Sequence, residues 1–76
     1  MSTHALVRVD GKKVRRLRQR KLWLIGDLAQ RSGVHRNVIS KIENQRGGGH
    51  PDSIRALAAA LGVEPQELLL LEDDED

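Results

Sequence analysis

The chain has 76 residues, which is the length of one small domain and too short for two. It contains no cysteine, which excludes disulfides and zinc fingers and favours the cytoplasm, and no segment has the roughly 20 apolar residues of a membrane span. The formal net charge is only +2, but seven of the 13 cations lie between residues 12 and 21, and five of the 11 acids form the run 72–76. A solvated helix face or a surface that faces polyphosphate would explain such a basic segment.

The first residues predict an arm followed by a helix. Residues 5–9 contain β-branched side chains in partial alternation, which is typical of an extended arm or edge strand, and we expect residues 1–10 to form this arm. Asp10 is a suitable cap for a helix that runs to about residue 20. Val14 and Leu17 give this helix its apolar face.

The second helix is expected over about residues 26–32. Leu28 and Ala29 supply its apolar side, together with the small residue Ser32. Gly33 follows and can adopt the left-handed conformation that ends a helix.

A third helix is expected over residues 34–44. His35 is a polar residue at the position of the cap. Val38, Ile39 and Ile42 recur at the spacing of one helix face.

The last third of the chain predicts two more helices, which makes the fold all-α with five helices. Residues 46–50 include three consecutive glycines and are expected to form a loop, after which Pro51 begins the fourth helix. The buried stripe of that helix is predicted to be Ile54, Leu57, Ala58 and Leu61. Gly62 ends it, and Pro65 opens a final helix that runs to Leu71.

Two short helices that cross closely are expected within residues 26–44. Ala29 permits their close approach and Gly33 permits the tight turn between them. The free face of the second of these helices carries donors and amides that can read base edges and phosphates: Arg36, Asn37, Ser40, Lys41 and Asn44.

The run from Leu28 to Asn44 resembles the helix-turn-helix of the phage-repressor (Xre/Cro-repressor) family, and the resemblance extends from Val14 to Leu69. It implies a five-helix domain spanning residues 11–71. It also implies a sequence-specific regulator of transcription that binds double-stranded DNA, with the 34–44 helix in the major groove.

The resemblance assigns roles to individual residues. The side chains expected to read bases are His35, Arg36, Asn37, Ser40 and Lys41. The side chains expected to contact phosphate are Lys21, Asn44 and Arg46. The resemblance further implies a salt bridge between Arg18 and Glu43, which would tie the recognition helix to the first helix.

Three features depart from the family's pattern. The family opens its second helix with Ser or Thr followed by Gln, whereas this chain has Leu24 and Ile25, so we expect a late helix start with Asp27 near the N-terminus. The loop with Gly47–Gly49 is longer than usual, either as a phosphate cradle or as a flexible linker. The acidic tail 72–76 is expected to be disordered.

Four consecutive leucines, Leu68, Leu69, Leu70 and Leu71, are more than one helix face can bury. Either they form the interface of a homodimer that reads a palindromic operator as a repressor, or they are the tolerated end of a frayed helix. A different class of function remains open: an adaptor or antitoxin-like module that holds a protein partner through this helix.

No catalytic, metal or cofactor site is expected. His4, His35 and His50 are dispersed and lack supporting carboxylates, and the serines have no His–Asp partners. The single aromatic residue, Trp23, is expected to belong to the core.

Overall fold

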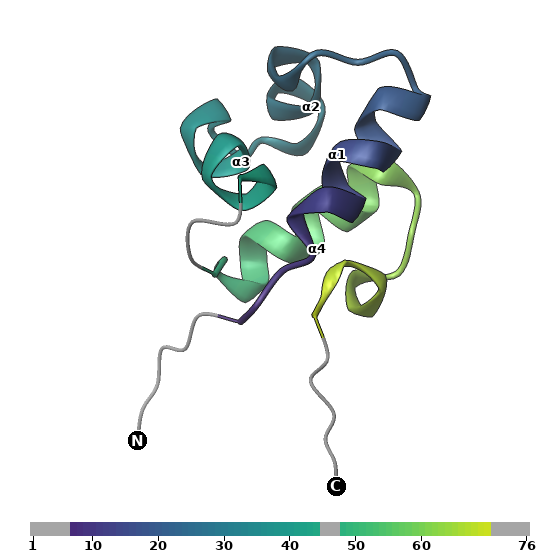
Figure 1. The fold of residues 1–76 in the computed structure, drawn as a ribbon. Helices are drawn as coiled ribbons and strands as arrows, with labels where there is room; N and C mark the ends of the chain where they lie inside the picture. The colour runs from purple at the N-terminus through teal and green to yellow at the C-terminus, as the bar shows by residue number, and fades with distance from the viewer. Residues whose placement is uncertain (1–6, 45–47, 71–76) are drawn as a thin grey trace, which may run out of the picture.

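The computed structural model describes residues 7–44 and 48–70. These residues form α1 (Gly11–Arg20), α2 (Ile25–Ser32), α3 (Arg36–Glu43), α4 (Pro51–Leu61) and the short 3-10 helix η1 (Pro65–Leu68). α2 packs on both α3 and α4, while α1 packs on α3 and η1 (Figure 1). The all-α fold class is confirmed, and the fifth predicted helix is this 3-10 turn.

The helix ends follow the local chemistry of the sequence. The Asp10 carboxylate accepts a hydrogen bond of 3.1 Å from the Lys13 backbone N–H and so caps α1 as predicted. Gly33 and Gly62 end α2 and α4 with φ angles of 78° and 77°, a conformation that side chains with a Cβ resist. Each of these three residues stops or starts a helix without help from distant parts of the chain.

The core forms where the inner faces of the helices meet. Its fully buried large side chains are Val14, Leu28, Ile39, Ile42, Ile54, Leu57 and Leu68. Val38, which was predicted to share the apolar repeat of its helix, is instead 37% exposed. Consecutive helical residues point about 100° apart, so a short helix that buries Ile39 and Ile42 turns Val38 toward solvent.

Residues 7–10 are extended and pair on both sides. Val7 and Gly49 exchange two backbone hydrogen bonds of 3.0 Å each. On the other side, residues 8–10 pair with residues 68–70 through backbone bonds of 2.7 and 3.0 Å. The extended arm is therefore present over the described residues, but Val9 is buried in the core. The division of the chain into an arm at 1–10, a domain at 11–71 and a tail at 72–76 stays a prediction.

The predicted final helix through Leu71 is wrong. Its helical part ends at Leu68, and Leu69 is extended, with φ −93° and ψ 145°. Pairing with residues 8–10 uses backbone groups of residues 68 and 70 that a continuing helix would have used itself. Leu71, residues 1–6, residues 45–47 of the predicted loop and residues 72–76 of the predicted tail lie outside the described residues.

Two other predicted boundaries also need correction. The third helix covers Arg36–Glu43 rather than 34–44, because His35 and Asn44 are the two flanking caps. The second helix begins at Ile25, before the late start expected near Asp27. The Asp27 carboxylate accepts a 2.8 Å hydrogen bond from the Leu24 backbone N–H, which is one half of a capping box, although Leu24 offers no side-chain cap of its own.

Candidate nucleic-acid interface

The exposed face of α3 is polar apart from Val38, which is 37% exposed. Arg36, Asn37 and Lys41 are exposed, and Ser40 is partly exposed. The opposite side of this eight-residue helix is buried through Ile39 and Ile42. A helix of this length is about 12 Å long, and its outer face is free to enter a DNA major groove, which is about 12 Å wide.

His35 caps the N-terminus of α3. Its Nδ1 accepts a hydrogen bond of 3.0 Å from the backbone N–H of Asn37. An accepting Nδ1 carries no proton, so the neutral ring has its N–H at Nε2, where it remains a donor. His35 is exposed at the end of the helix and thus combines a structural role with a free donor.

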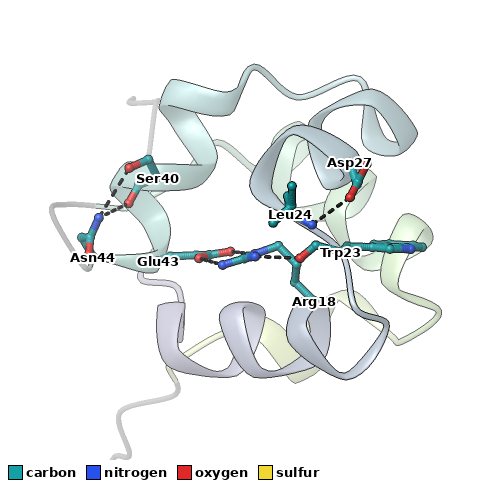
Figure 2. Close-up of polar contacts among 7 residues, drawn as sticks. All are labelled: Arg18, Trp23, Leu24, Asp27, Ser40, Glu43 and Asn44. Carbon is teal, nitrogen blue, oxygen red and sulfur yellow. Dashed lines mark hydrogen bonds and ion pairs between the residues drawn. The ribbon is translucent and has the colours of Figure 1, made fainter.

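Asn44 caps the other end of α3. Its Nδ2 donates to the Ser40 carbonyl oxygen at 2.9 Å and lies 3.4 Å from the Ser40 Oγ (Figure 2). The amide that was predicted to contact phosphate is therefore occupied within the helix. The amide has two N–H donors, so a phosphate contact through this group would displace the longer hydrogen bond to the Ser40 Oγ.

Arg18 and Glu43 meet in a two-point ion pair between α1 and the end of α3. The Arg18 Nε and Nη2 atoms each lie 2.8 Å from a Glu43 carboxylate oxygen, while Nη1 donates to the Trp23 carbonyl oxygen at 2.8 Å (Figure 2). Both side chains are buried. The hydrogen bonds to Glu43 raise the pKa of Arg18 above its ordinary value, against the opposing effect of burial. The pair holds α3 against α1.

Lys21, a predicted phosphate contact outside α3, lies in the turn that follows α1. Lys21 is exposed, and its Nζ lies 5.2 Å from the centre of the Trp23 ring. Arg31 approaches the same ring, with its guanidinium carbon 4.6 Å from the centre. Trp23 is half-buried and packs against the core, so it lies at the edge of the core to which it was predicted to belong. Arg46 lies outside the described residues.

Gly11 has a role that the sequence analysis missed. A Cβ added to Gly11 would overlap the carbonyl oxygen of Ile42 and lie 2.9 Å from its carbonyl carbon. This glycine lets α1 meet the backbone of α3 where the ion pair of Arg18 also joins the two helices. The sequence did offer one signal for this role. Gly11 is the first residue of a helix, and glycine has a low helix propensity, so its presence there suggests a steric reason.

The leucine run divides between the core and the surface. Leu68 is fully buried, Leu69 is half-buried and Leu70 is 42% exposed. Leu69 borders a small apolar pocket of about 140 Å³ whose other lining residues are Val7, Pro51, Ile54, Arg55 and Pro65. Leu70 is therefore the described leucine of this run with the most surface to offer a partner.

The described residues supply two further findings. No group of three or more His, Asp or Glu side chains within residues 7–44 and 48–70 is placed to hold a metal ion. Within the same residues, no helix has the length and apolar character needed to cross a membrane.

Comparison with known proteins identifies the fold. The helix-turn-helix family model matches residues 14–68. The crystal structure of the restriction-modification controller protein C.AhdI from Aeromonas hydrophila is 34% identical, with a TM-score of 0.72 over 78% of this chain and 89% of that chain. The hypothetical transcription factor NHTF from Neisseria is 30% identical, with a TM-score of 0.73 over 92% of this chain and 87% of that chain. No curated protein sequence matches significantly. The chain belongs to the helix-turn-helix family of DNA-binding transcriptional regulators.

Proposed function

We propose that this regulator reads a specific operator with α3 in the major groove of double-stranded DNA. The observation that carries the proposal is the set of exposed polar side chains on α3, a helix that is held in place by the buried pair of Arg18 and Glu43. A helix that only completed a core would not need this combination of exposed cations and amides. No catalytic activity is expected.

The side chains on this face suit direct readout. Arg36 can donate two hydrogen bonds to guanine, and Asn37 can pair with adenine through its amide. Lys41 supplies a third donor, while His35 and Ser40 flank the group. Lys21 and Arg46 are proposed to contact phosphate. Asn44 is proposed for the same role, through the amide N–H that otherwise makes the longer bond to the Ser40 Oγ.

The proposed state on DNA is a homodimer formed through the end of the chain. Leu70 is exposed beside the apolar pocket at Leu69, and a second copy would cover both. A twofold dimer would set the two copies of α3 about 34 Å apart and would read a palindrome with half-sites about 10 base pairs apart. Such a dimer would repress by occupying the operator.

Restriction-modification control is a second candidate for the biological role. It is favoured by the 34% identity with C.AhdI, whose name describes that role. The two candidates share the same DNA-reading site and differ in the genes that are controlled. The adaptor or antitoxin-like alternative differs more deeply, because its main contact would be with a protein through residues 68–71.

Selection of bound duplexes from a random library at physiological salt tests the proposal, with the size of the bound species measured by light scattering. We expect a palindrome bound by two chains. Loss of all binding as salt rises, with no motif recovered, would leave only attraction to a basic surface and would favour the adaptor. A recovered motif that lacks symmetry and is bound by one chain would contradict the proposed homodimer but not operator reading by α3.

A further inference from the structure

Two leucines in the turn between α1 and α2 are almost wholly exposed. Leu22 is 90% exposed and Leu24 is 74% exposed, and they lie on either side of Trp23. They are the two most exposed large apolar side chains among the described residues. Burial in the fold therefore does not explain why either position carries leucine.

The backbone at Leu22 favours a different residue. Its φ of 60° is left-handed, and it is the described non-glycine residue with a positive φ. The Leu22 N–H donates to the Gln19 carbonyl at 2.9 Å and the Trp23 N–H donates to the Arg18 carbonyl at 3.2 Å. This pattern closes a helix most easily when glycine holds the left-handed position. Leucine at this position is strained.

The backbone at Leu24 also favours a different residue. Leu24 precedes α2 with φ −82° and ψ 167°, which is the geometry of an N-cap, but its side chain accepts no hydrogen bond. Ser, Thr, Asp or Asn would cap the helix here. The Asp27 carboxylate satisfies only the Leu24 N–H (Figure 2). Leucine at this position forgoes stability that a small polar residue would provide.

Each leucine thus makes the local backbone less stable than the preferred residue type would. Features that lower stability without a structural return concentrate at functional sites. An exposed apolar pair in one turn is suited to insertion into a partner. The common explanation for both positions is contact with another molecule.

The charge around the turn indicates the chemistry of that molecule. Arg20, Lys21 and Arg31 are exposed, and no carboxylate of residues 7–44 or 48–70 forms an ion pair with them. Lys21 and Arg31 lie over the Trp23 ring instead. The nearby Asp27 is hydrogen-bonded to the Leu24 backbone. The apolar pair is therefore bordered by cations.

An acidic protein fits these features better than DNA or a second copy does. Phosphates would engage the cations but would leave both leucines without an apolar contact. A second copy related by a twofold axis at the turn would oppose the three cations with the same three cations. A helix with acidic and apolar faces satisfies both the charges and the leucines.

We propose that Leu22 and Leu24, bordered by Arg20, Lys21 and Arg31, bind an acidic amphipathic helix of another protein. This site does not depend on operator reading by α3. In Figure 2 Trp23 lies at the opposite edge of the view from Ser40 and Asn44, and Leu24 lies between them. Lys21 is also proposed to contact phosphate, so a partner bound here would compete with DNA for that one side chain.

The test uses the full chain and a synthetic helical peptide of about 16 residues with glutamates on one face and leucines on the other. Trp23 is the single tryptophan and adjoins both leucines, so its fluorescence reports binding. The variant L22G/L24S keeps every cation. We expect this variant to melt at a temperature about 2 to 8 °C higher and to bind the peptide at least about tenfold more weakly.

Two controls separate the apolar contact from charge. A peptide with the same glutamates and with alanine in place of leucine should bind both proteins equally weakly. The variant L24M, which keeps an apolar side chain, should retain peptide binding. Equal affinity of the wild type and L22G/L24S for the leucine peptide, or no binding by either protein, overturns the proposal.

A second experiment measures binding to the operator recovered by duplex selection. We expect L22G/L24S to bind it with unchanged affinity. An equal loss of operator and peptide binding would assign the turn to DNA and overturn the protein-docking site. If no operator is found, the peptide measurement still stands, so failure of this site and failure of operator reading are distinguishable.

Discussion

Gly11 in α1 lies directly against the Ile42 carbonyl group in α3, with no space between them for a Cβ. The contact is with backbone rather than with a flexible side chain, so the neighbour has little freedom to move aside. It sets the distance between the helix that carries Arg18 and the helix that carries Glu43. One missing methyl group thus allows the ion pair that holds the recognition helix.

We expect Gly11→Ala to lower the free energy of unfolding by about 3 kcal/mol, because α1 must move away from α3. Gly26→Ala is the matched control. Gly26 is helical and exposed, and a Cβ there would meet nothing within 4 Å, so that substitution should stabilise the domain by about 0.5 to 1 kcal/mol. Urea unfolding measures both changes. The same sign for both would refute the close-approach argument.

Glu43→Leu is expected to cost about 3 to 5 kcal/mol of stability, because it leaves the Arg18 guanidinium buried without its counter-charge. Arg18→Met together with Glu43→Leu should recover most of that loss. As a control, Arg55→Ala breaks the exposed pair with Asp52 and should cost about 0.5 kcal/mol or less. Chemical denaturation of the four proteins checks this. A double variant no more stable than Glu43→Leu would contradict the pair's role.

The raised pKa of Arg18 determines how its contribution depends on pH. A group whose pKa rises on folding adds stability that is fully present below its unfolded pKa and is lost only as pH rises through the folded pKa. For an arginine this window is strongly alkaline. The difference in stability between the wild type and the double variant Arg18→Met/Glu43→Leu should therefore stay constant from neutral pH to about pH 10. A steady decline over that range would be inconsistent with this assignment.

Arg36→Ala should lose about 1 to 3 kcal/mol of operator affinity and relax the preference at one base position. Lys21→Ala should instead weaken all sequences alike and reduce the slope of affinity against salt by about 1. Duplex selection and salt titrations with both variants make the comparison. An unchanged motif with Arg36→Ala would remove that side chain from the readers.

His35→Ala should destabilise the domain by about 1 kcal/mol through loss of the cap on α3, while His35→Asn should keep most of the stability. Operator binding then separates the two roles of this residue. If His35 also reads a base, both variants should lose preference at the same position. Full specificity in His35→Asn would make the residue a cap alone.

Features that depend on neighbours in sequence could be predicted. The cap at Asp10, the stops at Gly33 and Gly62 and the polar face of α3 follow from chemistry within a few residues. The pairing of Arg18 with Glu43 was available only through resemblance to a family, because the two residues are far apart in sequence. Asn44 illustrates the limit for the candidate site, since the hydrogen bond of its amide to Ser40 was not predicted, while its contact with phosphate stays a prediction.

The sequence by itself determined the all-α class, the order of the helices and the polar residues on the exposed face of α3, because hydrophobic periodicity and capping are local properties. Only the tertiary structure decided that residues 68–70 leave the helix to pair with residues 8–10, and that Gly11 is the close approach between α1 and α3. Both outcomes depend on segments brought together by folding. Backbone groups and space at such contacts are shared between distant residues, and local propensity yields to them.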